Sequence, residues 1–338
     1  MIIVMSHNAT DEQVEHVIDK VHSYGLRTHP IYGVQKTVIG IVGDDKTRVI
    51  ENMRGMAGVE DIIPILQPYK FAGRESHPDD TIIEFNGGVK VGGREVVVMA
   101  GPCAVEERGV LLQIARRVKK AGARILRGGA YKPRTSPYSF QGLGEEALKY
   151  LKEARDETGL LVVTEVTDPR NVELVSQYAD ILQVGARNMQ NFALLTEVGM
   201  SGHPVMLKRG ASSTIDDLLL AAEYVIIEGN RDIILCERGI TTFETYTRNT
   251  LDLSAVPSIK HMSHLPCIVD PSHATGRSHL VEPMSLAAVA SGADGIIVEV
   301  HPDPDQAMCD GPQALTLEQF DVMMEKLRSI APIVGRAL

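Results

Sequence analysis

From Glu95 to the end of the chain one pattern repeats: a short apolar run rich in valine and isoleucine, then a stretch with helical spacing. The pattern occurs eight times in about 240 residues, which is the length and order of a (β/α)8 barrel. The runs are apolar throughout and do not alternate with polar residues, as expected for parallel strands covered by helices. We therefore predict an α/β fold with a TIM barrel over residues 95–338.

The segments of this predicted barrel follow one another along the chain. The predicted strands are Val96–Ala100, Arg124–Leu126, Leu160–Val163, Ile181–Val184, Val205–Leu207, Ile233–Leu235, Ile268–Val269 and Ile296–Val298. The predicted helices are Glu107–Ala121, Glu145–Glu157, Pro169–Tyr178, Met189–Val198, Thr214–Glu228, Leu251–His261, Pro283–Ser291 and Leu317–Ile333.

Residues 1–70 follow a different pattern and form a separate small unit. Thr10 precedes two acidic residues and then valines at helical spacing, which is typical of a capped helix. Together with four extended runs and a second helical stretch, this gives the order βαββαβ of a ferredoxin-like domain. The predicted strands are Ile2–Met5, Leu26–Tyr32, Thr37–Val42 and Val59–Leu66, and the second predicted helix is Asp45–Met56.

Residues 71–94 join the two predicted domains. Tyr69–Asp80 contains proline, glycine and mixed charge, and it is predicted to be a linker. Beyond it, Asn86-Gly-Gly separates two short β-rich runs, Thr81–Phe85 and Val89–Val91, and is a strong signal for a hairpin turn. We therefore expect a linker and a β-hairpin ahead of the barrel.

Composition and charge narrow the range of functions. The formal net charge is -10, tryptophan is absent and aromatic residues make up 4% of the chain, which argues against nucleic-acid binding. No apolar run approaches the roughly 20 residues of a membrane span, and no basic segment precedes the apolar N-terminus as in a signal peptide. We expect a cytoplasmic protein whose ligands are small molecules.

Polar or reactive residues follow every predicted strand of the barrel. In TIM barrels the active site is built at the C-terminal ends of the strands, so these residues are expected to meet at one mouth. The segments are Gly101–Cys103, Arg127–Thr135, Thr164–Glu165, Gly185–Arg187, Lys208–Gly210, Glu237–Gly239, Asp270–His273 and Glu299–His301.

Four of the residues in these loops have the chemistry of metal ligands. Cys103, His273 and Glu299 follow the first, seventh and eighth strands, and Asp310 lies in the last loop. A thiolate, an imidazole and two carboxylates suit a divalent transition metal, but the mixed set does not choose among Mn²⁺, Fe²⁺, Co²⁺ and Zn²⁺. His301 competes with His273 as a ligand, and we prefer His273 because it follows its strand more directly.

Cations gather at the same strand ends. The loop Arg127–Pro137 is rich in glycine, which allows close approach of a ligand, and in proline, which stiffens the backbone. Seven positive charges around one pocket would repel each other unless anions filled it. More than one phosphate or carboxylate group is therefore implied. Arg209 is the uncertain member, because it can also point outward or pair with Glu165 or Glu237. The cations are Arg127, Lys132, Arg134, Arg187, Lys208, Arg209 and Arg238.

Several of these motifs together resemble the 3-deoxy-D-arabino-heptulosonate 7-phosphate (DAHP) synthases, in the branch close to the 3-deoxy-D-manno-octulosonate 8-phosphate (KDO8P) synthases. The resemblance covers residues 95–338. Where KDO8P synthases have Lys-Ala-Asn-Arg-Ser, this chain has Lys132-Pro-Arg-Thr135, which is similar to the DAHP branch. The matching motifs are Arg127-Gly-Gly-Ala-Tyr-Lys-Pro-Arg-Thr-Ser-Pro137, Gly101-Pro-Cys103, Gly185-Ala-Arg187, Asp270-Pro-Ser-His273 and Glu299-Val-His-Pro302.

The resemblance implies a reaction in which phosphoenolpyruvate condenses with D-erythrose 4-phosphate and releases phosphate, the first step of the shikimate pathway. It implies that Glu165 orients a water, that Arg134 and Thr135, next to Pro133, bind the phosphate of erythrose 4-phosphate, and that Lys132 is a candidate proton donor. The metal on Cys103, His273, Glu299 and Asp310 would polarise the aldehyde. The residues implied to bind phosphoenolpyruvate are Arg127, Lys132, Ala186, Arg187, Lys208 and Arg238.

The resemblance also extends to regulation and assembly. The N-terminal unit resembles the ferredoxin-like (ACT-like) extension that binds an aromatic amino acid as a feedback inhibitor, so tyrosine or phenylalanine is the expected effector. The family implies a homotetramer. Cys309 adjoins Asp310, and we expect a Cys103–Cys309 disulfide in metal-free enzyme left in air. KDO8P synthase and a non-catalytic amino-acid-sensing barrel remain as alternative functions.

Overall fold

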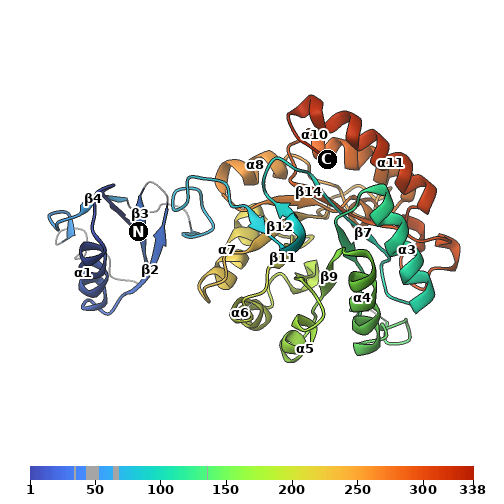
Figure 1. The fold of residues 1–338 in the computed structure, drawn as a ribbon, viewed down its shortest axis with the longest axis horizontal. Helices are drawn as coiled ribbons and strands as arrows, with labels where there is room; N and C mark the ends of the chain where they lie inside the picture. Colours follow the sequence, from blue (N-terminus) through green and yellow to red (C-terminus); the bar gives the residue numbers. More distant parts are fainter. Residues whose placement is uncertain (34–35, 43–52, 64–67, 135) are drawn as a thin grey trace. The chain divides into compact units, whose positions relative to one another are not determined.

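The computed structural model of the chain describes residues 1–33, 36–42, 53–63, 68–134 and 136–338. It divides into two compact units, Met1–Pro78 and Asp79–Leu338 (Figure 1). In the described part of the chain, every helix is too short or too polar to cross a lipid bilayer.

The first unit is an antiparallel sheet with strand order β2-β3-β1-β4 and a helix, α1 (Asp11–His22), in the βαββ…β order that the sequence predicts. Thr10 Oγ1 accepts a hydrogen bond from the Gln13 backbone N–H, and Gln13 Oε1 accepts one from the Thr10 backbone N–H, so a capping box fixes the start of α1. The predicted helix Asp45–Met56 falls largely outside the described residues. The strands are β1 (Ile2–Met5), β2 (Arg27–Tyr32), β3 (Thr37–Val42) and β4 (Val59–Ile63).

The segment after β4 packs with this first unit. Tyr69, Phe71 and Ala72 are buried, and the ring of Phe71 lies over Gly40, where an added Cβ would be 2.1 Å from the ring. The contacts therefore extend the first unit to Pro78, past the end at residue 70 that the composition indicates. Apolar burial accounts for this difference, since the prolines and charges that mark a linker in the sequence surround two buried aromatic rings.

The second unit is a closed barrel of eight parallel strands, with helices around the outside (Figure 1). Strand β14 pairs with β7 and closes the barrel. The strands are β7 (Val97–Gly101), β8 (Ile125–Arg127), β9 (Leu161–Glu165), β10 (Ile181–Val184), β11 (Val205–Lys208), β12 (Ile233–Glu237), β13 (Cys267–Val269) and β14 (Gly295–Glu299). The helices are α3 (Arg108–Ala121), α4 (Glu145–Thr158), α5 (Val172–Ser176), α6 (Phe192–Met200), α7 (Ile215–Ile226), α8 (Ala255–Met262), α9 (Pro271–Thr275), α10 (Ser278–Ala290) and α11 (Leu317–Ile330).

The predicted hairpin is present and belongs to the barrel's core. Its strands β5 (Ile83–Glu84) and β6 (Lys90–Val91) pair antiparallel, and Gly87 and Gly88 both have φ of 76°, which favours glycine. Ile83 and Val91 of the hairpin are fully buried in the cluster of side chains that fills the barrel. The hairpin therefore stabilises the barrel by burying apolar surface.

Two features of the barrel differ from the sequence prediction. Most strands continue one or two residues beyond their apolar runs, because the backbone hydrogen bonds between neighbouring strands do not require an apolar side chain. As a result Arg127, Glu165 and Glu299 are the last residues of their strands. The short helix α9 is absent from the prediction, since five residues carry too little periodicity to be recognised. Asp270 caps it and Pro271 occupies its first turn.

Candidate metal centre and anion-binding cavity

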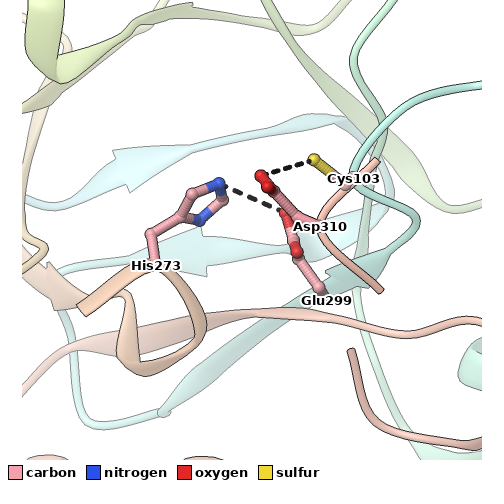
Figure 2. A group of neighbouring side chains, drawn as sticks. All are labelled: Cys103, His273, Glu299 and Asp310. Atoms are coloured by element: carbon pink, nitrogen blue, oxygen red, sulfur yellow. Dashed lines mark hydrogen bonds and ion pairs between the residues drawn. The ribbon is translucent and has the colours of Figure 1, made fainter. Parts of the chain in front are cut away.

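Four side chains from different elements meet at the C-terminal mouth of the barrel. Cys103 follows β7, His273 lies on α9, Glu299 ends β14, and Asp310 lies in the loop after it (Figure 2). His273 Nε2 is 3.2 Å from Glu299 Oε1, and Cys103 Sγ is 3.3 Å from Asp310 Oδ2. One ligand atom from each of the four residues lies within 4.8 Å of the others. The structure thus brings together the four ligands that the sequence predicts.

The arrangement fits a divalent metal ion. Metal–nitrogen, metal–oxygen and metal–sulfur bonds of about 2.0 to 2.3 Å place donor atoms about 3 to 4 Å apart. Two donor pairs of this group lie 3.2 and 3.3 Å apart, and all four donor atoms lie within 4.8 Å of one another. The donor types match a transition metal. His301 lies elsewhere, with Nδ1 2.7 Å from the Asp303 carbonyl oxygen, so His273 is the histidine of this group.

Asp310 is held in an unusual backbone conformation. Among the described residues it is the one non-glycine residue with positive φ, at 52°. Aspartate tolerates the left-handed region better than most residues. This conformation places its carboxylate beside Cys103, at the start of the turn Gly311–Gln313.

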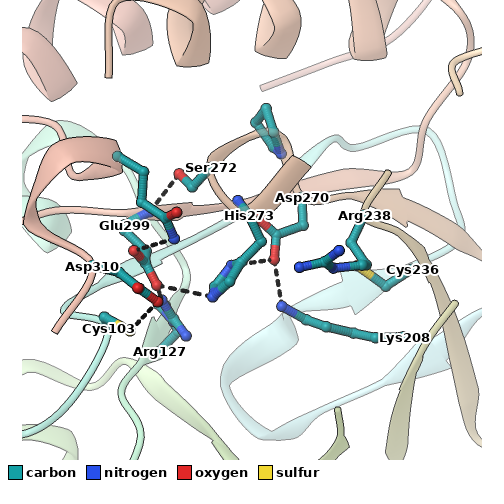
Figure 3. Close-up of polar contacts among 12 residues, drawn as sticks. Cys103, Arg127, Lys208, Cys236, Arg238, Asp270, Ser272, His273, Glu299 and Asp310 are labelled. Atoms are coloured by element: carbon teal, nitrogen blue, oxygen red, sulfur yellow. Dashed lines mark hydrogen bonds and ion pairs between the residues drawn. The ribbon is translucent and has the colours of Figure 1, made fainter. Parts of the chain in front are cut away.

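Asp270 organises the residues behind His273 (Figure 3). Its carboxylate accepts a hydrogen bond from the His273 backbone at 2.9 Å, lies 2.8 Å from His273 Nδ1, and pairs with the Lys208 ammonium. Burial alone would raise the pKa of the Asp270 carboxyl, but His273 and Lys208 hold it well below its usual range. Burial also lowers the pKa of the His273 imidazole, which favours the neutral form that binds metal. A carboxylate behind a histidine ligand fixes the ring and its tautomer.

Glu299 is fully buried and ion-paired (Figure 3). Its Oε1 accepts a hydrogen bond from Arg127 Nη1 at 2.5 Å, and its backbone N–H donates to Ser272 Oγ at 3.0 Å. Burial alone would raise the pKa of the Glu299 carboxyl, whereas His273 and Arg127 lower it below the usual value. The residue is therefore ionised, as a metal ligand must be.

A cavity of about 750 Å³ opens at this mouth, and His273 and Asp310 of the four-residue group line it. Its wall carries six cations, five of which the sequence predicts. Glu165, Pro133 and Ala186 also line it, while Thr135 lies outside the described residues. A cavity with this many cations suits ligands that carry several negative charges. The cations are Lys132, Arg134, Arg187, Lys208, Arg238 and Arg248.

Two predicted cations have other positions. Arg127 is buried beside Glu299 and does not line the cavity, and among the described residues its buried Nε has no hydrogen-bond partner. Arg209 instead pairs with Glu237 at 2.9 Å and with Asp252 at 3.0 Å. Of the orientations that the sequence leaves open for Arg209, the structure shows the pair with Glu237.

Several cavity cations contact protein groups that a bound anion would replace. Arg187 Nη1 donates to the Pro133 carbonyl oxygen at 2.7 Å, and Arg238 Nη1 donates to Asn249 Oδ1 at 2.6 Å. Neutral acceptors compensate a guanidinium charge less well than a phosphate, with which arginine forms bidentate pairs. In the described part of the chain Arg187 and Arg238 thus have neutral partners that an anion can replace, whereas Lys208 pairs with the Asp270 carboxylate and Arg248 Nη1 lies 3.7 Å from Asp310 Oδ2.

Cys103, Lys132 and Cys309 are in contact. The two sulfurs lie 3.2 Å apart, and both cysteines are free thiols. Lys132 Nζ is 3.1 Å from Cys103 Sγ. The hydrogen bond to Cys309 and then burial raise the pKa of Cys103, while the same hydrogen bond lowers the pKa of Cys309. Burial alone would lower the pKa of Lys132, but the adjacent Cys103 raises it, so the lysine carries a proton.

Sequence reasoning missed Arg248 and Gln313 as parts of this site, and it placed Asp270 at the barrel mouth without giving it a role. Asp270 has a detectable signal, because an aspartate before proline after a strand is typical of a helix cap. Arg248 lies in a loop between two predicted segments, and Gln313 follows Pro312 in another loop. Nothing in the local pattern distinguishes these two residues from solvent-exposed ones.

Known proteins resemble the chain over its whole length. The model of the DAHP synthetase I family matches residues 80–332, and that of the DAHP synthase ferredoxin-like domain matches residues 1–67. A phospho-2-dehydro-3-deoxyheptonate aldolase from Thermotoga maritima is 50% identical over 335 residues, 99% of each chain. A 2-dehydro-3-deoxyphosphooctonate aldolase from Syntrophobacter fumaroxidans is 36% identical over 265 residues, 73% of this chain and 91% of that protein.

Solved structures agree with these sequence relationships. The crystal structure of the phospho-2-dehydro-3-deoxyheptonate aldolase (DAHP synthase) from Thermotoga maritima has a TM-score of 0.80, is 49% identical, and covers 99% of this chain and 98% of its own. A truncated form of the Thermotoga maritima 3-deoxy-D-arabino-heptulosonate 7-phosphate synthase has a TM-score of 0.74 at 49% identity, over 79% of this chain and 97% of its own. The predicted fold, a barrel preceded by a ferredoxin-like domain, is confirmed.

Proposed function

Since this chain belongs to the DAHP synthetase I family and is a DAHP synthase, we propose that phosphoenolpyruvate and D-erythrose 4-phosphate react in the cavity beside Cys103, His273, Glu299 and Asp310. A bond forms between C3 of phosphoenolpyruvate and the aldehyde carbon. Water adds at C2, and the bond between C2 and the bridging oxygen of the phosphate group then breaks, which releases inorganic phosphate. The observation that carries this proposal is the four-ligand group beside a wall of six cations.

Phosphoenolpyruvate is proposed to lie deepest in the cavity. Its carboxylate and phosphate need several cations in fixed positions, which Arg187, Lys208 and Arg238 provide in the cavity wall. The resemblance adds Arg127, which is buried beside Glu299. Lys208 is buried in its pair with Asp270, so its position is set before the substrate arrives. Such preorganisation lowers the cost of ordering side chains on binding.

Glu165 is proposed to orient the water that adds at C2. The side chain lines the cavity, and its Oε2 accepts a hydrogen bond from Gln183 Nε2 at 3.2 Å. Gly185, which follows the next strand, leaves space for this carboxylate, because an added Cβ would lie 2.0 Å from Glu165 Oε1 and would displace it. The backbone thus leaves room for the carboxylate.

The erythrose 4-phosphate side of the cavity is proposed to be the loop that carries Arg134 and Thr135. Arg134 lines the cavity and contacts Cys309, with Nη1 2.5 Å from its sulfur. The resemblance assigns both residues to the phosphate of the four-carbon sugar, and Pro133 between Lys132 and Arg134 restricts the backbone there.

A divalent ion, Mn²⁺, Fe²⁺, Co²⁺ or Zn²⁺, is proposed on Cys103, His273, Glu299 and Asp310, and when bound it polarises the aldehyde carbonyl as a Lewis acid. Lys132 is proposed to donate the proton that neutralises the developing alkoxide. Its Nζ lies 3.1 Å from Cys103 Sγ, beside the proposed ligands, and its pKa lies above the usual lysine value, so it carries a proton to donate.

A phosphate-release assay tests this function. With phosphoenolpyruvate and a divalent metal, we expect turnover with erythrose 4-phosphate and little with arabinose 5-phosphate. The opposite preference would assign the chain to the KDO8P reaction of its 2-dehydro-3-deoxyphosphooctonate aldolase relatives, and no turnover with either sugar would support a sensing barrel.

The ferredoxin-like domain is proposed to bind tyrosine or phenylalanine as a feedback inhibitor. We expect that deleting residues 1–78 removes inhibition and leaves turnover. The cut follows Pro78 because Phe71 packs on Gly40 inside the first unit, and the structure of a truncated form of a relative has been solved. The initial rate of phosphate release by both enzymes, with and without each amino acid, measures the inhibition, and leucine serves as the control. A truncated enzyme inhibited like the full chain would refute it.

The homotetramer and cytoplasmic residence stay predictions.

Metal-free enzyme in air is expected to lose activity as Cys103 and Cys309 form a disulfide, since their sulfurs lie 3.2 Å apart and need to approach to about 2.05 Å. Molecular oxygen takes the two electrons and two protons of the thiols. Cys309→Ser should slow the loss several-fold, and metal should protect the wild type. Activity and free thiols followed over time measure this, with Cys267→Ser as the control. Equal decay of both variants would exclude the disulfide route.

A further inference from the structure

Gln313 connects two of the metal ligands although it is neither a ligand nor a cation. Its side-chain Nε2 donates to Glu299 Oε2 at 2.8 Å, and its backbone N–H donates to the Asp310 carbonyl oxygen at 3.2 Å. Gln313 is 3% exposed. Glu299 ends a strand and Asp310 begins a turn, so one buried residue links ligands from two elements.

The Gln313 hydrogen bond holds Oε2 of Glu299 and leaves Oε1 as the oxygen that faces His273. Among the described residues, Gln313 is the one hydrogen-bond donor to Oε2, while Oε1 faces His273 Nε2 at 3.2 Å. A carboxylate whose far oxygen is held by a donor presents its other oxygen alone. Without that donor, the buried Oε2 loses its partner, and the carboxylate is held by Arg127 through Oε1 alone.

Arg248 fixes the orientation of the Gln313 amide. Arg248 Nη1 donates to Gln313 Oε1 at 3.2 Å and lies 3.7 Å from Asp310 Oδ2. If the amide were flipped, its NH₂ group would face the guanidinium and its oxygen would face the Glu299 carboxylate. Both contacts would be repulsive, so the neighbouring charges select one orientation.

We propose that Gln313 is a positioning residue that holds Glu299 and Asp310 in the geometry required for metal binding, with its amide oriented by the cavity residue Arg248. This inference rests on the proposed metal site. Outer groups that orient a ligand commonly change metal affinity by about 10- to 100-fold when they are removed.

The chain provides a matched control for this proposal. Gln183 is also a buried glutamine that donates to a strand-end glutamate, Glu165, at 3.2 Å. Glu165 does not belong to the four-ligand group. Gln183→Met and Gln313→Met therefore remove the same kind of bond, and only the second should change metal binding.

The test measures Co²⁺ and Mn²⁺ binding to the full-length demetallated proteins by calorimetry, together with the visible spectrum of the Co²⁺ complexes. We expect Gln313→Met to raise the metal Kd about 10- to 100-fold and to shift the Co²⁺ ligand-field bands. Arg248→Met should raise the Kd by less, and Gln183→Met should leave both readouts as in the wild type. Thermal unfolding of each variant without metal establishes that it is folded, and Gln313→Leu serves if the methionine variant is not.

Two results overturn the proposal, and they differ from each other. Wild type and Gln313→Met with equal Kd values and equal Co²⁺ spectra would refute the role of Gln313 and leave the metal site standing. A wild type that binds neither ion would refute the metal site itself, and the inference with it.

Discussion

Replacing Lys132 with methionine is expected to lower kcat/KM for the condensation by about 10³- to 10⁴-fold. The substitution removes a general acid, commonly worth 10²- to 10⁴-fold, and a cation from the site where charge develops. Methionine has an unbranched side chain similar in length to that of lysine, so it can occupy the space beside Cys103 and Gly129 that Lys132 fills. Steady-state phosphate release at varied phosphoenolpyruvate measures the effect.

Lys132→Arg separates the two roles of this lysine. Arginine keeps the charge and donates a proton poorly, so we expect it to retain most of the phosphoenolpyruvate affinity with a kcat far below the wild type. Lys149 is a control on the outside of the barrel, paired with Glu145 on α4, and Lys149→Met should be nearly silent. A Lys132→Met enzyme within tenfold of the wild type would contradict the assignment.

Asp270→Asn is expected to have the largest effect on stability and also to weaken metal binding. The substitution leaves the Lys208 ammonium buried without its carboxylate, and breaking a buried ion pair commonly costs about 3 to 5 kcal/mol. His273 loses the group that fixes its ring, for which a 10- to 100-fold weaker metal affinity is the usual result. Denaturant unfolding and metal titration measure the two effects.

Asp294 provides the control for that experiment. It is a fully buried carboxylate in the barrel that pairs with Lys260 at 2.9 Å and with Arg336 at 2.8 Å, and it is not among the groups around the four ligands. Asp294→Asn should destabilise the protein to a similar extent without changing the metal Kd. If Asp270→Asn lowers the stability but leaves the metal Kd unchanged, metal binding by His273 does not depend on Asp270.

The architecture is well predicted from the sequence because eight apolar runs are long enough to be recognised one by one. Cys103 and Glu299 were predictable for the same reason, since each directly follows or ends such a run. The position of Asp310 was harder to predict, because it depends on a left-handed backbone conformation that no periodicity in the sequence shows.

The supporting residues of the site could not be predicted in this way. Gln313 and Arg248 meet only because two loops fold toward each other, with Nη1 of the arginine 3.2 Å from Oε1 of the glutamine. The burial of Phe71 on Gly40 was hidden for a similar reason, since a contact 31 positions apart leaves no local pattern. Long-range contacts between irregular segments are the part of this molecule that single-sequence reasoning misses.

Exhaustive removal of metal, followed by the phosphate-release assay with phosphoenolpyruvate and erythrose 4-phosphate, tests the central claim most directly. We predict that the demetallated protein, kept reduced so that Cys103 and Cys309 remain thiols, has no turnover and recovers it with one equivalent of Mn²⁺ or Co²⁺ per chain. Full turnover in the metal-free, chelated enzyme would contradict the assignment of Cys103, His273, Glu299 and Asp310 as the ligands of an essential ion.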